Sequence, residues 1–255
     1  DLGVVQISLP ANAPAVNRVP IASRREGEFA DADGEIVRLL GYSLARTDYT
    51  PGETLDIVLF WQPLQALTTD AQILLQLADA AGRPIAAQAS PPVFGRYPTT
   101  RWQPGYPVRD PQRIVIPPET PAGEYVVKVG LSAVGTAQPF IARQSGGDAI
   151  DLQGIIVGEG RPHDFTPPQV PNALQATWGD RIQLLGYGPL SDTYAPGDVV
   201  SLALYWKALA SMDASYTVFV HLLDASGQIR GQADSVPGSG TLPTTGWVPD
   251  EYLLD

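Results

Sequence analysis

Residues 34–42 read GEIVRLLGY, and residues 179–187 read GDRIQLLGY. The match continues in the same register without a gap. YTPGE at 49–53 corresponds to YAPGD at 194–198, and PTTRW at 98–102 corresponds to PTTGW at 243–247. Self-similarity at one fixed offset indicates the duplication of a structural unit. We therefore interpret residues 34–110 and 179–255 as two copies of one unit.

Each copy carries apolar residues at alternate positions, the pattern of a strand with one buried face. In the first such strand these residues are Leu55, Ile57, Leu59 and Trp61, matched in copy two by Val200, Leu202, Leu204 and Trp206. In the next strand they are Ile73, Leu75 and Leu77, matched by Val218, Val220 and Leu222. That strand ends in Asp-Ala-x-Gly, which predicts a tight hairpin with Asp79 and Asp224 as turn formers. We expect Trp61 and Trp206 to fill the cores.

The composition agrees with many short strands joined by turns. Hydrophobic residues make up 44% of the chain, and its 25 Gly and 25 Pro punctuate short apolar runs. No apolar stripe with helical spacing is sustained, so the sequence predicts an all-β fold. Turn signals at this spacing are typical of tandem immunoglobulin-like or fibronectin-III-like β-sandwiches.

The expected domain organisation follows from the repeat. Copy one continues with strands at 113–117, 124–132 and 151–157, so its sandwich spans residues 29–160. A Pro-rich linker covers 161–178, and repeat two covers 179–255. Repeat two ends at the counterpart of Asp110 and lacks about three strands, so we expect an incomplete sandwich, completed by further residues or by a strand from elsewhere. Residues 1–28 read as the last strand of a preceding module plus a linker, because residues 1–7 resemble 151–157.

Charge and cysteine content exclude some functions. The net charge is −11, which argues against binding to nucleic acid or to anionic membrane surfaces, because both require a basic patch. Cysteine is absent, which removes disulfides, thiolate metal sites and a cysteine nucleophile. No apolar run approaches the length of a membrane span.

Five motifs carry a resemblance to a known family. They are LLGY, PG[E/D], YW-x-AL at 205–209, YTVFVHLLD at 216–224 and PTT-x-W. With these motifs the chain resembles a β-sandwich module of bacterial envelope proteins. In that family the module often forms a C-terminal extracytoplasmic appendage of multi-pass glycosyltransferases similar to protein O-mannosyltransferases. The resemblance implies an extracytoplasmic location and a parent protein anchored in the membrane, and it implies no catalytic residues.

Candidate sites for metal binding or catalysis are weak. We expect His163 to be solvated in the linker and His221 to project from an outer sheet face, since no partners stand at fixed spacing from either. The carboxylates of residues 31–35 could ligate calcium but lack the remaining ligands of a calcium loop, which favours a turn. We predict no metal, no cofactor and no catalytic residue.

One aromatic loop offers a candidate binding surface. Trp102 and Trp247 lie in matching Pro/Thr-rich loops, where packing under the loop is the simpler interpretation. Alternatively, they form a sugar-stacking platform with Tyr97, Arg101 and Tyr106. Leu242 and Gly246 replace Tyr97 and Arg101 in copy two, which weakens this alternative.

These observations lead to one principal expectation and one alternative. The chain is expected to be a non-catalytic spacer or interaction module of a bacterial envelope protein, on the outer side of the membrane. The alternative is a carbohydrate-binding accessory domain of a membrane glycosyltransferase or hydrolase. The expected partners are accordingly a glycan or another envelope protein.

Overall fold

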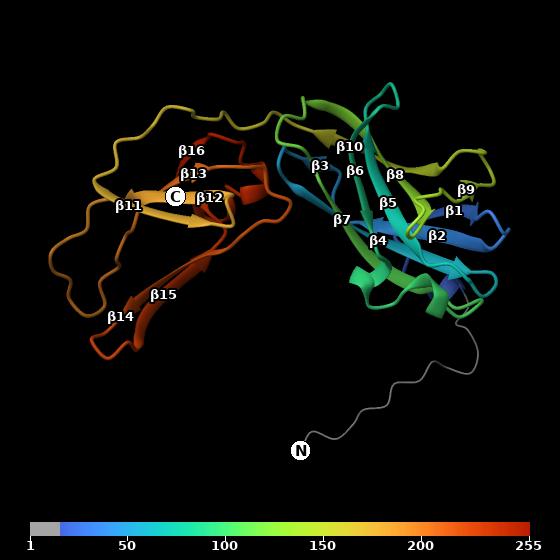
Figure 1. Ribbon diagram of the computed structural model, residues 1–255, viewed down its shortest axis with the longest axis horizontal. Helices are drawn as coiled ribbons and strands as arrows, with labels where there is room; N and C mark the ends of the chain where they lie inside the picture. The colour runs from blue at the N-terminus through green and yellow to red at the C-terminus, as the bar shows by residue number, and fades with distance from the viewer. Residues whose placement is uncertain (1–15) are drawn as a thin grey trace, which may run out of the picture. The chain divides into compact units, whose positions relative to one another are not determined.

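A computed structural model describes residues 16–255 (Figure 1). Within these residues the regular elements are strands and 3-10 helices of three or four residues. The expectation of an all-β fold is therefore confirmed. The chain divides into two compact units, the first holding β1 to β10 and the second β11 to β16. The strand expected in residues 1–7 lies outside the described residues.

The first unit is a sandwich of two five-stranded sheets. One sheet has the order β7-β4-β2-β1-β9 and the other β3-β10-β8-β5-β6. The bounds are β1 (Ser23–Ala30), β2 (Ile36–Leu44), β3 (Asp48–Tyr49), β4 (Thr54–Pro63), β5 (Ala71–Ala78), β6 (Pro84–Ser90), β7 (Val108–Val115), β8 (Gly123–Ala133), β9 (Ile141–Ala142) and β10 (Ala149–Val157). Three 3-10 turns accompany them, η1 (Val16–Arg18), η2 (Pro92–Gly95) and η3 (Thr99–Arg101).

The core of this unit is built as the alternation predicts. The side chains of Leu55, Leu59 and Trp61 on β4 are 0% exposed, and those of Ile73, Leu75 and Leu77 on β5 are at most 1% exposed. The ring of Phe29 packs edge-on against Trp61, with 5.9 Å between ring centroids. Burial of these large apolar side chains supplies the main driving force for folding of the unit.

The second unit contains fewer strands. One sheet has the order β11-β12-β13-β16, from β11 (Asn172–Trp178), β12 (Ile182–Tyr187), β13 (Leu204–Ala208) and β16 (Tyr252–Leu254). The other pairs β14 (Val218–Leu223) with β15 (Ile229–Ser235). Two 3-10 turns, η4 (Gly238–Gly240) and η5 (Thr244–Gly246), precede β16. The buried cluster consists of Trp206, Ala208, Met212, Trp247 and Leu253.

Both copies contain the same bulge at the glycine of the LLGY motif. The register of β1 with β2 shifts beside Gly41, and the register of β11 with β12 shifts beside Gly186. Each glycine has φ of 147°, and a Cβ there would collide with the backbone of the neighbouring strand. A conformation that side chains rarely adopt, together with this close approach, requires glycine at both positions.

Three boundaries differ from the sequence-based expectation. β1 begins at Ser23, inside the segment assigned to a linker, and β11 occupies the end of the linker assigned to 161–178. The strand expected at 113–117 is β7, which starts earlier at Val108. β1 is mostly polar and β11 mixes polar and apolar residues without a period of two, so neither strand shows a clear alternation in the sequence.

The expected burial of alternate residues in copy two is wrong at its beginning and at Leu222 near the end of β14, whereas Val218 and Val220 are half-buried. Val200 is 41% exposed, although its counterpart Leu55 is fully buried, and Leu222 is 55% exposed. The neighbouring strand β16 has only three residues and pairs with Tyr205 to Lys207, so residues 199–203 have no ladder on that side. An alternating pattern produces burial only where a second layer covers the apolar face.

Candidate functional site

The two tryptophans of the PTT-x-W motifs are buried anchors of their loops. Trp102 is 2% exposed and donates its indole N–H to the carbonyl oxygen of Tyr97 at 3.0 Å. Trp247 is 1% exposed and donates in the same way to Leu242 at 3.1 Å. Neither ring presents a face to solvent, so the structure supports the packing interpretation and not the stacking platform.

The first threonine of each motif locks the same loop to the start of a strand. The hydroxyl oxygen of Thr99 accepts a hydrogen bond from the backbone N–H of Ala71 at 2.8 Å. The hydroxyl of Thr244 accepts from the corresponding N–H of Tyr216 at 3.0 Å and donates to the carbonyl of Ala214 at 2.9 Å. Because both copies repeat these bonds, the motif has a structural role in the unit.

The remaining members of the predicted platform do not gather around an accessible tryptophan face. Tyr97 and Tyr106 are half-buried, and Arg101 is exposed at the end of η3. Tyr97 contributes its backbone carbonyl to the indole of Trp102, which requires no particular side chain at that position. This explains why leucine can replace Tyr97 in copy two.

The expectation that His163 is solvated is wrong. Its side chain is 23% exposed, and its Nδ1 lies 3.0 Å from Oε1 of Glu251, which is completely buried. Arg161 binds both carboxylate oxygens of Glu251, with Nη2 at 2.9 Å from Oε2. The start of the linker is thus fastened to the second unit through one carboxylate. His221 is exposed on β14, as expected.

The predicted acidic turns are structural. Oδ1 of Asp31 accepts hydrogen bonds from the N–H groups of Asp33 (3.0 Å) and Glu35 (2.8 Å), which defines a turn rather than a metal site. At the hairpin tips, hydrogen bonds lower the pKa of Asp79, with the N–H of Arg83 as the largest cause. The pKa of Asp224 falls to about 2, chiefly because of the Ser226 hydroxyl. Stabilisation of the charged form is the common cause.

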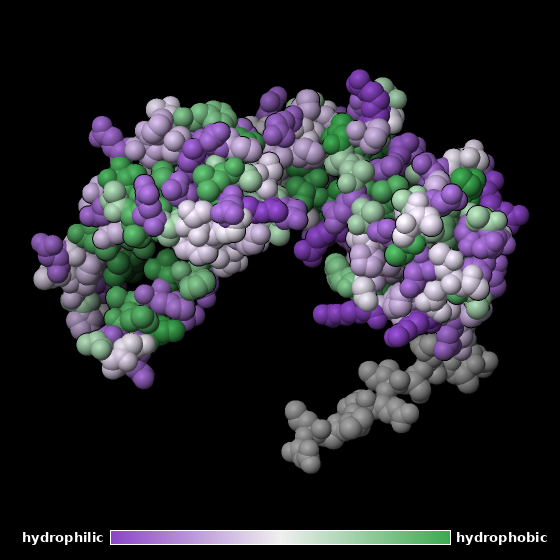
Figure 2. Space-filling model, in the orientation of Figure 1, coloured by the Kyte–Doolittle hydropathy of each residue, from purple (hydrophilic) through white to green (hydrophobic). Residues whose placement is uncertain are grey.

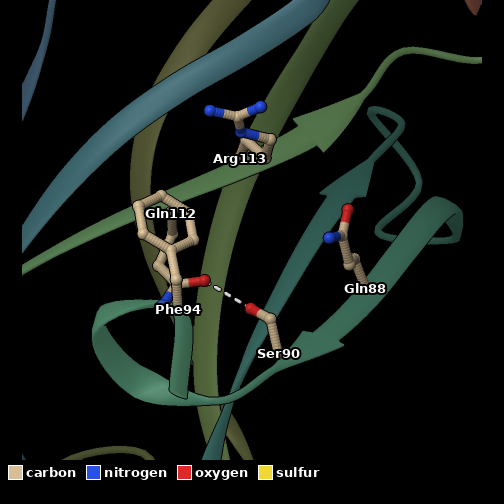
Figure 3. A pocket seen from close by; sticks show the side chains of 5 residues that line it. All are labelled: Gln88, Ser90, Phe94, Gln112 and Arg113. Carbon is tan, nitrogen blue, oxygen red and sulfur yellow. Dashed lines mark hydrogen bonds between the residues drawn. The ribbon is translucent and has the colours of Figure 1, made fainter. Parts of the chain in front are cut away.

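A hollow of about 390 Å³ opens on the first unit between the edge strands of its two sheets (Figure 3). β6 ends one sheet and β7 ends the other, and η2 closes one side. The lining residues are Gln88, Ser90, Phe94, Gln112 and Arg113. Ser90 donates its hydroxyl hydrogen to Oε1 of Gln112, the dashed contact in Figure 3.

The turn that carries Phe94 has an unusual backbone. Val93 (φ 49°, ψ 41°) and Phe94 (φ 54°, ψ 35°) both adopt the left-handed helical conformation, followed by Gly95 at φ 79°. This conformation is unfavourable for side chains with a Cβ, and most of all for a β-branched residue such as valine. The ring of Phe94 is 54% exposed, and the guanidinium carbon of Arg113 lies 5.7 Å from its centroid.

The buried side chain of Asp110 stabilises the turn at Val93 and Phe94 through hydrogen bonds. Its Oδ1 accepts the N–H of Val93 at 2.7 Å and Nε2 of Gln112 at 2.8 Å, while Oδ2 accepts the indole N–H of Trp61 at 3.1 Å. Burial raises the pKa of the Asp110 carboxyl, and these three hydrogen bonds oppose that shift. The carboxylate therefore fixes both the turn and the side chain of Gln112 in the wall of the hollow.

Sequence reasoning did not find this hollow, because its five residues come from three separate elements. One signal was available. Copy two has Gly238, Ser239 and Gly240 where copy one has Val93, Phe94 and Gly95. A large aromatic residue in a turn that the duplicate builds from small residues indicates a role specific to copy one.

No family model and no curated protein matches this chain. Among solved structures, the C-terminal domain of wzt shares 14% identity over 64% of this chain and 95% of its own, with a TM-score of 0.35. Chicken MD-1 complexed with lipid IVa shares 14% identity over 47% and 93%, with a TM-score of 0.27. Spo0M, a sporulation control protein from Bacillus subtilis, shares 13% identity over 74% of both chains, with a TM-score of 0.27.

The fold defines a β-sandwich protein. In the described part of the chain, residues 16–255, no helix is long and apolar enough to cross a membrane. The same residues contain no group of three or more histidine, aspartate or glutamate side chains placed to hold a metal ion.

Proposed function

We propose that this chain is a non-catalytic interaction module of a bacterial envelope protein, on the outer side of the membrane, and that the open edge of β14 in its second unit accepts an added β-strand. The resemblance of its repeat motifs to extracytoplasmic sandwich modules supports the location. The observation that carries the interaction is the contrast between strand β5 and its counterpart β14.

Strand β5 is paired along both edges. It pairs with β6 from Ile73 to Ala78 and with β8 over its whole length, from Ala71 opposite Ala133 to Ala78 opposite Val126. Within residues 16–255, β14 pairs only with β15. Its second edge therefore offers unpaired N–H and C=O groups, which is the requirement for adding a strand.

The apolar side chains around that edge are also uncovered (Figure 2). Phe219 is 68% exposed, Leu222 55%, Leu223 54% and Ile229 51%. The sequence of β14 alternates in the same way as that of its counterpart β5, but the apolar side chains of β5 at alternate positions are buried. Several large apolar side chains exposed on one short hairpin are typical of a protein–protein contact.

Copy one indicates which kind of strand fits this edge. The strand that covers β5 is β8, with Tyr125, Val127, Val129 and Leu131 facing the core. We therefore expect the added strand to be an extended segment in which large apolar residues occupy alternate positions. Backbone hydrogen bonds would supply affinity, and the alternate side chains would supply specificity.

A peptide with the sequence of residues 121–134 tests this proposal directly. We expect it to bind the chain saturably in isothermal titration calorimetry and to slow amide exchange along β14. The matched control is the same peptide with Val127→Asp and Val129→Asp, which keeps the length and the turns but removes the apolar face. Equal heats and unchanged exchange with both peptides would refute the proposal.

A covalent graft gives an independent measurement that does not depend on peptide solubility. Residues 111–157 appended after Asp255 would place a β8-like strand in the register that copy one uses. We expect the melting temperature of the second unit to rise and the exposure of Phe219 and Leu222 to fall. An unchanged melting temperature would show that β14 does not accept such a strand.

A further inference from the structure

The turn at Val93 and Phe94 is more strained than its duplicate, although both turns have the same shape. In copy two, Gly238, Ser239 and Gly240 have φ values of 64°, 53° and 97°, close to the values in copy one. The anchoring bond is also repeated, because the N–H of Gly238 donates to Oδ1 of Asp255 at 2.7 Å. The turn therefore forms without bulky residues, and glycine would relieve the strain at Val93.

Packing of the Phe94 side chain offsets little of this backbone strain. Its ring is 54% exposed, whereas the aromatic residues that stabilise the core are almost fully buried. Copy two shows that the turn can form with less backbone strain. Backbone strain that is kept beside a hollow is typical of a binding or switching site and is not required for folding.

The walls of the hollow carry groups that form directional hydrogen bonds. Gln112 is 3% exposed and is fixed at both ends, by Ser90 and by Asp110. Gln88 is half-buried on β6, and within residues 16–255 its carboxamide has no hydrogen-bond partner. Figure 3 shows the Gln88 and Arg113 side chains on opposite walls, with the ring of Phe94 at one end.

These groups select a chemical class of ligand. An exposed aromatic ring binds the apolar face of a sugar ring, while a carboxamide and a guanidinium each bind a pair of neighbouring hydroxyl groups. A simple anion is a poorer fit, because Arg113 is the one cationic group in the lining and already lies 3.6 Å from Asp56. Four of the five lining residues also carry a polar group, so the hollow presents hydrogen-bonding groups beside the aromatic ring, as a sugar requires.

We propose that the hollow between β6 and β7 is a saccharide-binding subsite, in which Phe94 stacks on a sugar ring and Gln88 and Arg113 bind its hydroxyl groups. The subsite belongs to copy one alone, since copy two has no aromatic residue in the turn. It is independent of the strand-binding edge of β14, which lies in the other unit.

The test uses the complete chain and a panel of free oligosaccharides of glucose, galactose, mannose, rhamnose and N-acetylglucosamine. Saturation-transfer NMR identifies any that bind, and calorimetry gives their dissociation constants. The decisive variant combines Val93→Gly with Phe94→Ser, which gives copy one the turn of copy two. Because this turn is compatible with the fold, we expect an equal or higher melting temperature and at least a tenfold loss of saccharide affinity.

Two further variants complete the test. Gln88→Ala, which leaves the turn untouched, is expected to weaken the same saccharide at least threefold. Phe165→Ser removes an aromatic ring that is 57% exposed and lies outside both proposed sites, and it is expected to leave saccharide binding unchanged. The proposal is overturned if the unaltered chain binds no member of the panel, or if the variant with the turn of copy two binds as tightly as the unaltered chain.

Discussion

The indole N–H of Trp61 donates a hydrogen bond of 3.1 Å to Oδ2 of Asp110, and both side chains are completely buried. Asp110 thereby connects the central tryptophan of the first unit to the strained turn at Val93. Copy two retains only part of this arrangement. Asp255 accepts the N–H of Gly238, but within residues 16–255 the buried Nε1 of Trp206 has no hydrogen-bond partner. Both cores therefore contain a central tryptophan, but only in copy one does the indole N–H of that tryptophan have a hydrogen-bond acceptor.

Replacement of Asp110 is expected to destabilise the first unit strongly. Asp110→Asn places an amide donor where Oδ2 accepts the indole N–H, so that a buried donor loses its partner. A buried polar group without a partner costs about 1–3 kcal/mol, and the bonds to Val93 and Gln112 are disturbed as well. We expect a loss of about 2–4 kcal/mol in the free energy of unfolding, measured by urea denaturation.

The matched control for this change is Asp56→Asn. Asp56 is 71% exposed and forms only a surface ion pair with Arg113. Such pairs contribute about 0–1 kcal/mol, so the control should unfold close to the unaltered protein. Equal stability of the two variants would contradict the role assigned to the buried carboxylate.

The glycines of the LLGY motifs are expected to tolerate no side chain. In Gly41→Ala the new Cβ would meet the carbonyl oxygen of Ser23 at a backbone angle that alanine rarely adopts. Steric overlap and backbone strain together should cost about 2–4 kcal/mol, seen as a lower urea midpoint. Gly154→Ala, at a strand position whose nearest atom is 4.0 Å away, should change stability by less than about 0.5 kcal/mol. A mild effect of Gly41→Ala would show that the bulge can relax.

The ion pair between Arg161 and Glu251 is expected to fasten the linker to the second unit. Arg161→Met leaves the buried carboxylate with the N–H of Val248 (3.1 Å) as its hydrogen-bond donor, beside the Nδ1 atom of His163. Breaking a buried pair costs about 3–5 kcal/mol, and the 30% exposure of Arg161 reduces this to about 2–3 kcal/mol. Tryptophan fluorescence during urea denaturation would report the loss through Trp206 and Trp247.

Arg181→Met provides the comparison for the linker contact. Arg181 pairs with Asp213 at 3.5 Å, and both side chains are largely exposed, so its removal should cost less than about 1 kcal/mol. Faster exchange of the Tyr252 amide, which donates to the carbonyl of Asp164 at 2.8 Å, is expected in Arg161→Met alone. If both variants lose the same stability, Glu251 does not depend on Arg161.

The sequence predicted those parts of the fold that leave a local pattern. The alternating residues of β4 and β5, the glycine turns and the repeat were all readable, because each reflects constraints on neighbouring positions. Strands β1 and β11, which lack a clear alternation, were missed, since their place is set by pairing with β2 and β12. The exposure of Val200 and Leu222 was also missed, because alternation indicates a face suited to burial but not whether another layer covers it.

The candidate site was less predictable than the fold. The sequence suggested Trp102 and Trp247 as binding residues because they are aromatic. Whether such a tryptophan is buried depends on an acceptor for its indole N–H, which the backbone carbonyls of Tyr97 and Leu242 provide here. The hollow at Phe94 depends on two left-handed residues that local propensity argues against. Comparison of the two copies at this turn could have indicated it, since a duplicate acts as a built-in reference for what the fold alone requires.

The hairpin of β14 and β15 is expected to weaken in acid as Asp224 becomes protonated. Its carboxylate accepts hydrogen bonds from the Ser226 hydroxyl (2.6 Å), the Gln228 amide (3.0 Å) and Arg230 (2.8 Å), which lower its pKa from 3.8 to about 2. Because the folded pKa lies below the unfolded one, the ionised group stabilises the hairpin above about pH 4, and this contribution disappears as the pH falls toward 2.

NMR titration of the Asp224 carboxyl carbon and of the Ser226 and Gln228 amides should show one transition near pH 2. Asp224→Asn should abolish the amide transition, whereas Asp213→Asn, at an 85% exposed side chain, should leave it in place. Titration of Asp224 near 3.8 would mean that these hydrogen bonds do not persist in solution.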